Sequence, residues 1–151
     1  MENKICCSFG HREVYKDISA RLQEIIKDLI INKGVKTFYT GGMGQFDGKF
    51  ASAVQMMQKS YPEIEIVLIC PYLKQELNTY KEWYEHNYDS ILIPSELDGI
   101  HYKAAIKARN RWMVDNSDYI VSYVYREFGG AYDAVQYAKR QGKEIYNTIE
   151  K

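Results

Sequence analysis

The chain has 151 residues, a length typical of one domain with a single hydrophobic core. Lysine and arginine together number 20, as do aspartate and glutamate, so no overall charge attracts nucleic acid or an acidic membrane surface. No apolar run is long enough to span a bilayer and no leader-like segment opens the chain. We therefore expect a cytoplasmic protein that has neither a membrane nor nucleic acid as a partner.

The three cysteines, Cys6, Cys7 and Cys70, all lie in apolar segments. An odd number of cysteines cannot all pair within one chain, and free thiols in apolar strands behave as small hydrophobic groups. No cluster of histidine and cysteine has the spacing of a zinc site. We therefore expect buried, reduced thiols, no bound metal and no cofactor.

Strands and helices alternate along the first half of the chain. Apolar residues recur at helical spacing between Ile18 and Ile30, which predicts an amphipathic helix that Gly34 ends. Residues 64–70 are almost wholly apolar, as expected of a strand that helices cover on both faces. In chain order we expect a strand at 4–9, a helix at 18–30, a strand at 35–40, a helix at 49–59 and a strand at 64–70.

The alternation continues through the second half of the chain. We expect partial helix at 72–87, a strand at 90–93, a loop at 94–99, a helix at 102–115, a strand at 119–123, a helix at 132–141 and a strand at 144–148. Such alternation is typical of a mostly parallel sheet with right-handed crossovers and helices on both faces. The prediction is a single Rossmann-like α/β domain, a three-layer sandwich over residues 1–151.

Tyrosine is unusually frequent, with 14 residues. Its large apolar face and polar tip suit an interface between chains as well as the edge of a core. The stretch 72–88 holds Tyr80, Trp83 and Tyr84, and we expect it to join copies of the chain into a homo-oligomer.

Three loops follow strands, and ligands of such sheets bind beyond the carboxyl ends of the strands. In the first loop, Gly10 lets the backbone turn closely, while His11 and Arg12 supply hydrogen bonds to an anion. An ordinary turn with a solvated arginine is the alternative.

The second loop places Gly41, Gly42 and Gly44 between a strand and a helix. These glycines let the backbone approach a phosphate or ribose, and the amides of the helix N-terminus then face negative charge. The spacing is that of neither a dinucleotide fingerprint nor a Walker loop, and a tight turn without ligand is the alternative. Asp47 either caps the helix, which we favour, or holds a ribose hydroxyl.

The third loop leads from a strand to the glycine pair Gly129 and Gly130. Arg126 there can grip a phosphate and Tyr125 can stack on a base. The alternative is a glycine-pair turn packed by aromatic side chains. Two such glycine loops at one edge of a sheet support each other as ligand-binding loops.

Arg109 lies near the middle of an apolar stripe on the predicted helix 102–115. A guanidinium group there needs a partner, which is a carboxylate, a carbonyl or an anionic ligand. We expect ligand contact, with a buried ion pair or snorkelling to solvent as the alternatives. The stripe consists of Tyr102, Ala105, Ile106, Ala108, Trp112 and Met113.

The sequence also offers candidate catalytic acids. Glu96 and Asp98 follow a predicted strand as a pair, although a solvated turn with capping character explains such a pair more often. Glu127 and Asp133 flank the third loop. Ser8 has no evident base and orienting acid, so nucleophilic hydrolysis is not supported.

In this order and spacing, the motifs resemble those of the SLOG superfamily, particularly its small YpsA-like bacterial and phage branch. The resemblance covers nearly the whole chain. It implies a Rossmann-like fold that binds nucleotides or their derivatives. The residues that carry it are Ser8-Phe9-Gly10-His11-Arg12, Phe38-Tyr39-Thr40-Gly41-Gly42-Met43-Gly44 with Asp47, and the segment from Arg109 to Asn147 with Gly129-Gly130.

The resemblance also relates the chain to the Lonely Guy phosphoribohydrolases, which cleave the N-glycosidic bond of cytokinin ribotides. Arg109 and Met113 match the Arg-Lys-x-x-Met helix of those enzymes, but Gln136 stands where their catalytic glutamate would be. An amide cannot act as a general acid or base, nor stabilise an oxocarbenium ion as a carboxylate does. The Pro-Gly-Gly-x-Gly-Thr motif departs further, with Phe128 for Pro, Tyr132 for the third Gly and Asp133 for Thr.

The leading hypothesis is therefore a protein that senses or sequesters a nucleotide or a nucleotide-derived ligand without catalysis. One alternative is a hydrolase or transferase of N-glycosidic bonds, with Glu96, Asp98, Glu127 or Asp133 as the acid. Another is a protein-interaction module that keeps a vestigial pocket.

Overall fold

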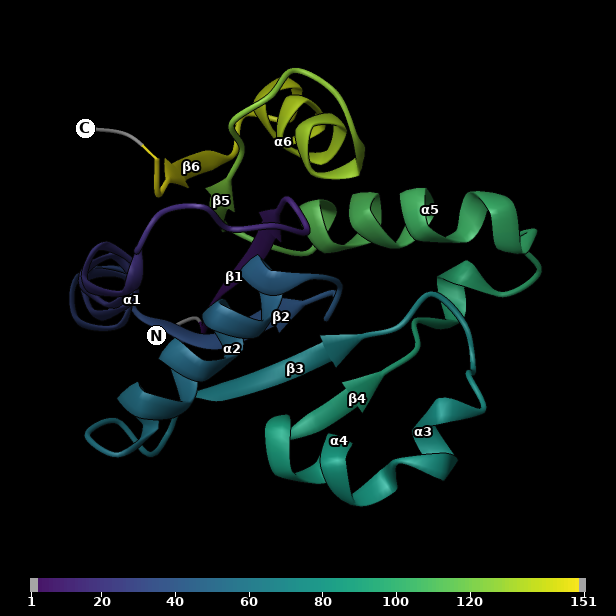
Figure 1. The fold of residues 1–151 in the computed structure, drawn as a ribbon, viewed down its shortest axis with the longest axis horizontal. Coiled ribbons are helices and arrows are strands. Elements are labelled where there is room, and N and C mark those ends of the chain that lie inside the picture. The colour runs from purple at the N-terminus through teal and green to yellow at the C-terminus, as the bar shows by residue number, and fades with distance from the viewer. Residues whose placement is uncertain (1–2, 150–151) are drawn as a thin grey trace.

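The computed structural model describes residues 3–149, which form one six-stranded sheet flanked by helices (Figure 1). All paired strands are parallel, in the order β4-β3-β2-β1-β5-β6. This arrangement confirms the predicted Rossmann-like α/β fold. The strands are β1 (Lys4–Gly10), β2 (Val35–Thr40), β3 (Glu65–Ile69), β4 (Ser90–Leu92), β5 (Tyr119–Tyr123) and β6 (Glu144–Asn147).

The helices agree with the predicted elements in order, and the fourth predicted strand is followed by a single 3₁₀ turn at Ser95–Leu97. The partly helical stretch separates into two short helices, which lie beyond β4 at the outer edge of the sheet (Figure 1). The α-helices are α1 (Ser19–Lys33), α2 (Gln45–Gln58), α3 (Glu76–Thr79), α4 (Lys81–Asn87), α5 (Tyr102–Asp115) and α6 (Gly130–Arg140).

Two helices begin earlier than the sequence predicts, α2 at Gln45 rather than residue 49 and α6 at Gly130 rather than residue 132. The residues at their N-caps are Gly44, with a φ of 95°, and Gly129, with a φ of 100°. This region of φ is open to glycine at little steric cost, so the backbone turns out of the strand and into the helix within very few residues. The glycine loops therefore place helix N-termini close to the ends of the strands.

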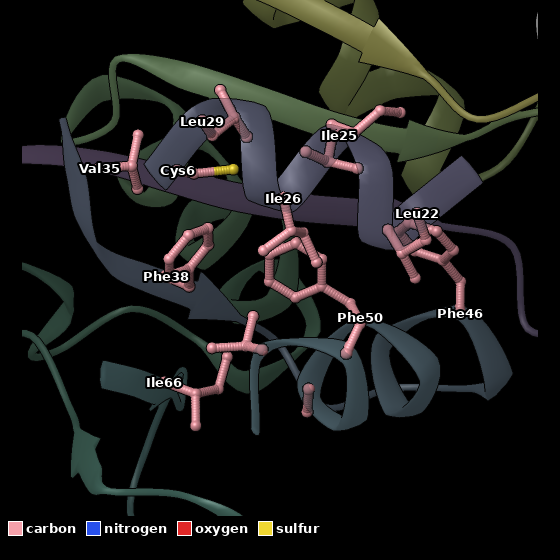
Figure 2. Packing of buried hydrophobic residues seen from close by; sticks show 14 of the residues in the cluster. Cys6, Leu22, Ile25, Ile26, Leu29, Val35, Phe38, Phe46, Phe50 and Ile66 are labelled. Carbon is pink, nitrogen blue, oxygen red and sulfur yellow. The ribbon is translucent and has the colours of Figure 1, made fainter. Parts of the chain in front are cut away.

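Alternating residues of the strands pack into two separate cores. Cys6 points toward α1 and α2, where Phe38, Phe46 and Phe50 fill the space (Figure 2), while Cys7 points to the opposite face and packs with residues of α5 and α6. All three cysteines are buried and free, as predicted. Burial raises the pKa of the Cys7 thiol to about 12, so this thiol stays protonated and apolar in character.

The strand order reverses beside β1. From β1 the chain builds outward through β2 and β3 to β4, then returns so that β5 pairs with the other edge of β1. The loops that follow β1 and β5 therefore diverge, and they leave a crevice at the carboxyl ends of these strands.

The aromatic stretch around α3 and α4 lies at the surface, with Tyr80 60% and Trp83 56% exposed. Tyr84 is half-buried and stacks on Tyr88. Self-association through this stretch stays a prediction. No helix among residues 3–149 is both long and apolar enough to cross a membrane.

Candidate ligand-binding site

A cavity of about 360 Å³ opens at the crevice beside β1, bordered by α5 and by the first turn of α6. It lies where the three predicted loops meet. Nine predicted residues line it: Gly10, His11, Arg12, Gly41, Asp47, Arg109, Arg126, Gly129 and Gly130. Six residues that the sequence does not predict also line the cavity: Ser8, Phe9, Met43, Ile106, Asn110 and Ala131.

Three predicted ligand-binding residues, Gly42, Gly44 and Tyr125, do not line the cavity but contact residues of the loops that form it. Gly42, at a φ of 66°, donates its amide to Thr40 Oγ1 at 3.3 Å, so this amide is used within the loop rather than offered to a ligand. Gly44 passes so close to Arg12 that a Cβ would lie 2.7 Å from its Cα. Tyr125 packs edge-on against His11, with ring centroids 4.4 Å apart.

Arg109 forms the base of the cavity and is only 2% exposed. Its guanidinium group donates to the carbonyl of Ile69 at 2.8 Å and to that of Gly41 at 3.4 Å, which ties α5 to the ends of β3 and β2. Two backbone carbonyls are therefore partners of this buried cation, which also donates to Asn110 Oδ1 at 3.0 Å and to Met43 Sδ at 3.2 Å. Gly41 is needed here because a Cβ would lie 2.9 Å from Arg109 Cζ.

The apolar stripe predicted around Arg109 is only partly buried. Ala105 and Met113, one turn before and after Arg109, lie in the interior, but Tyr102 is 64% exposed and Ile106 38%. Ile106 therefore faces the cavity rather than the core.

Asp47 is buried beneath the second loop. Its carboxylate accepts hydrogen bonds from the Met43 amide at 2.9 Å and from Ser8 Oγ at 3.1 Å. The favoured prediction that Asp47 caps the first amides of α2 is wrong, because Asp47 is itself the third residue of the helix and binds an amide that precedes it. Asp47 thus fastens the glycine loop to the end of β1.

The pKa of Asp47 is raised to about 6 by burial, against the lowering effects of its hydrogen bonds and of Arg109. Folded Asp47 therefore holds its proton more tightly than in the unfolded chain, where the ordinary value is 3.8. We expect wild type to lose roughly 2.5 kcal/mol of stability relative to Asp47→Asn as pH rises from 4 to 7. Urea unfolding of both proteins across this range measures the difference.

The control for the Asp47 experiment is Asp98→Asn, which removes a carboxylate exposed in a turn. Its unfolding free energy should follow that of wild type across the pH range. If wild type and Asp47→Asn also gave parallel profiles, the protonation of Asp47 would not be linked to folding.

His11 lines the cavity with its imidazole buried, at 3% exposure. Its Nε2 is buried and has no hydrogen-bond partner among the described residues. Burial and the positive charge of Arg126 lower the pKa of His11, which favours the neutral ring. Arg126 itself is exposed and lies over the Phe128 ring, 4.8 Å from its centroid.

None of the four candidate acids lines this cavity. Glu96 accepts a hydrogen bond from Trp112 Nε1 at 3.1 Å, a contact that lowers its pKa, and Asp98 and Glu127 are exposed elsewhere. Asp133 borders a neighbouring hollow between α5 and α6. Within the described part of the chain, no three His, Cys, Asp or Glu side chains form a group that could hold a metal ion.

Solved structures share this fold at low sequence identity. The DNA processing protein A of Helicobacter pylori aligns with a TM-score of 0.64 at 16% identity, and its structure was solved to explain how it binds single-stranded DNA. The alignment covers 94% of this chain and 63% of that chain. The DNA processing protein A of Streptococcus pneumoniae aligns with a TM-score of 0.65 at 12% identity, over 95% of this chain and 49% of its own. The chain thus spans less than two thirds of either protein.

These structures correct one expectation from the sequence. Equal numbers of acidic and basic residues led us to exclude nucleic acid as a partner, yet a protein of the same fold binds single-stranded DNA. The overall charge of a chain does not report how charge is distributed around a site. The balance of acidic and basic residues therefore says nothing against nucleic acid as a partner.

Among curated proteins, the chain is 27% identical over 135 residues to the uncharacterized SPbeta prophage-derived protein YoqJ of Bacillus subtilis (strain 168). The match covers 80% of this chain and 79% of YoqJ. Residues 9–149, which hold all three loops of the cavity, match the YpsA family, described as the YspA SLOG family. The chain therefore belongs to the YpsA family of SLOG proteins.

Proposed function

We propose that the chain binds a nucleotide or nucleotide-derived ligand in the cavity beside β1, and senses or sequesters that ligand without cleaving it. The observation that carries this proposal is that three arginines, Arg12, Arg109 and Arg126, line one cavity together with the first residues of α6. Guanidinium groups and the amides of a helix N-terminus both favour a phosphate.

The lining offers two kinds of contact to a phosphate, backbone amides and arginine side chains. Gly130 and Ala131 present the start of α6, and Arg12 and Arg126 lie exposed at the rim. His11 lines the cavity as well, with its imidazole edge-on to the Tyr125 ring.

The position of the carboxylates favours binding over cleavage. Hydrolysis of an N-glycosidic bond needs a carboxylate beside the scissile bond. Glu96, Asp98 and Glu127 lie outside the cavity and its neighbouring hollow, and Asp133 borders the hollow but not the cavity. Asp47 is held by hydrogen bonds beneath the loop. Gln136, at the position of the Lonely Guy glutamate, borders the hollow between α5 and α6.

Isothermal titration calorimetry with a panel of mononucleotides, dinucleotides and cyclic dinucleotides tests the proposal. Arg12→Ala and Arg126→Ala are each expected to weaken binding about tenfold, since each removes one charge-assisted contact to phosphate. Arg21→Ala, on the surface of α1 and paired with Glu24, is the control and should bind as wild type does. A panel in which no compound binds would overturn the proposal.

Chromatography of the same mixtures separates binding from catalysis. Intact nucleotide after prolonged incubation supports a binding protein. Release of free base would show an N-glycosidase and contradict the second half of the proposal.

A second candidate is binding of single-stranded nucleic acid, favoured by the fold shared with DNA processing protein A of Helicobacter pylori. The same basic residues would then contact the phosphates of a strand. A competition experiment tests whether both ligands use one site. An oligonucleotide that displaces a bound mononucleotide binds in the same cavity.

A further inference from the structure

A second hollow lies beside the cavity, in the groove between α5 and α6. Its volume is about 290 Å³, and three residues, Ile106, Asn110 and Gly130, line both it and the main cavity. The two spaces are therefore neighbours that share part of their lining, including the first residue of α6. A Cβ at Gly130 would have no atom within 4 Å, so there is open space beside the backbone at this point.

Basic residues line both spaces in a chain whose charges balance overall. The main cavity has Arg12, Arg109 and Arg126 against the buried Asp47. The second hollow adds three more cations against the single carboxylate of Asp133. These cations are Lys107, Arg111 and Arg140.

Two of the added cations lie near the same aromatic ring. Arg111 Cζ lies 4.7 Å and Arg140 Cζ 5.9 Å from the centroid of the Tyr137 ring, whose hydroxyl donates to Asp115 at 2.7 Å. Among residues 3–149, neither guanidinium group forms a salt bridge with a carboxylate. Both guanidinium groups thus lie near one tyrosine ring, and their forked N–H donors suit a phosphate.

From this geometry we infer that the ligand carries a second phosphate, which lies in the hollow between α5 and α6. The inference rests on the proposed function and names its ligand class: two phosphates separated by a nucleoside, as in a 5′-phosphorylated dinucleotide or a single strand. One phosphate lies at the start of α6, the nucleoside passes Asn110 and Gly130, and the next phosphate meets Arg111 and Arg140.

Calorimetry with AMP, GMP, CMP and UMP, each against the corresponding 5′-phosphorylated dinucleotide, tests the inference. We expect at least one dinucleotide to bind tenfold or more tightly than its mononucleotide, because it gains contacts to the second pair of guanidinium groups. In the double variant Arg111→Ala/Arg140→Ala, this ratio should fall to near one.

The matched control is Lys103→Ala/Lys139→Ala, which removes two exposed cations from the same helices, neither of them lining a hollow. It should preserve the ratio of affinities. A single-stranded DNA of eight nucleotides then distinguishes the two kinds of ligand. If it binds more tightly than the dinucleotide, the ligand is a strand; if it does not, the ligand is a dinucleotide.

Equal affinity for mononucleotides and dinucleotides, or a ratio that survives in the Arg111→Ala/Arg140→Ala variant, would overturn the inference and leave the proposed function standing. Failure of every probe to bind would overturn the proposed function, and the inference with it. Circular dichroism of each variant verifies that the fold is intact before titration.

Discussion

Replacing Arg109 by methionine is expected to lower the free energy of unfolding by about 3 kcal/mol. Methionine fills much of the same space but cannot donate to the carbonyls of Ile69 and Gly41, which Arg109 joins across the ends of β3 and β2. It also leaves Asp47 buried without the nearby positive charge. Urea unfolding monitored by circular dichroism measures the loss.

Two further variants isolate the role of the guanidinium group. Arg111→Met changes an exposed arginine two residues along the same helix and should shift the unfolding free energy by no more than about 0.5 kcal/mol. Arg109→Lys keeps the charge without the planar fork, so it should recover only part of the loss. An Arg109→Met protein as stable as wild type would show that the buried guanidinium does not hold the loops together.

Gly10→Ala is expected to cost roughly 3 kcal/mol for a different reason, because it overfills a packed core. A Cβ on Gly10 would lie 2.3 Å from the Cγ and Cδ2 atoms of the Phe46 ring. That ring is fully buried and stacks on Tyr123, so it has no free space into which to move. Thermal and urea unfolding of the variant measure the cost.

Gly48→Ala is the matched control for this substitution. Gly48 lies within α2 and a Cβ there meets no atom within 4 Å, so alanine should stabilise the protein by about 0.5–1 kcal/mol. Adding Phe46→Leu to Gly10→Ala should cost less than the sum of the two single changes, because leucine relieves the clash. Strict additivity would mean that the Phe46 ring does not oppose the new methyl group.

Much of the fold follows from patterns that are local in the sequence. The bounds of β2, β5 and α5 agree with the predicted 35–40, 119–123 and 102–115, since hydrophobic patterning defines them and glycines flank β2. The sequence predicts the starts of α2 and α6 too late because glycines are typical of loops. In the structure, Gly44 and Gly129 adopt a positive φ as N-caps.

The site was less predictable where it depends on tertiary contacts. A helical wheel indicates that Arg109 is buried, but only the packed sheet brings the Ile69 and Gly41 carbonyls to it. Asn110 follows Arg109 directly and accepts a hydrogen bond from its Nε at 3.0 Å, so proximity in sequence was an available signal. The sequence gives Ser8 no base for nucleophilic hydrolysis, and only the packed sheet brings its hydroxyl to Asp47.

The central position of β1 has a consequence for how the chain folds. Cys6 in β1 pairs with Tyr119 in β5, so one edge of the first strand has no partner until most of the polypeptide has been synthesised. On the ribosome, the half from β1 to β4 can assemble early through short connections. The other edge of β1 stays unpaired until β5, which is far away in the sequence, has been synthesised. Closure of this central pair is therefore a late step, and until then the nascent chain exposes a strand edge on which another chain can pair.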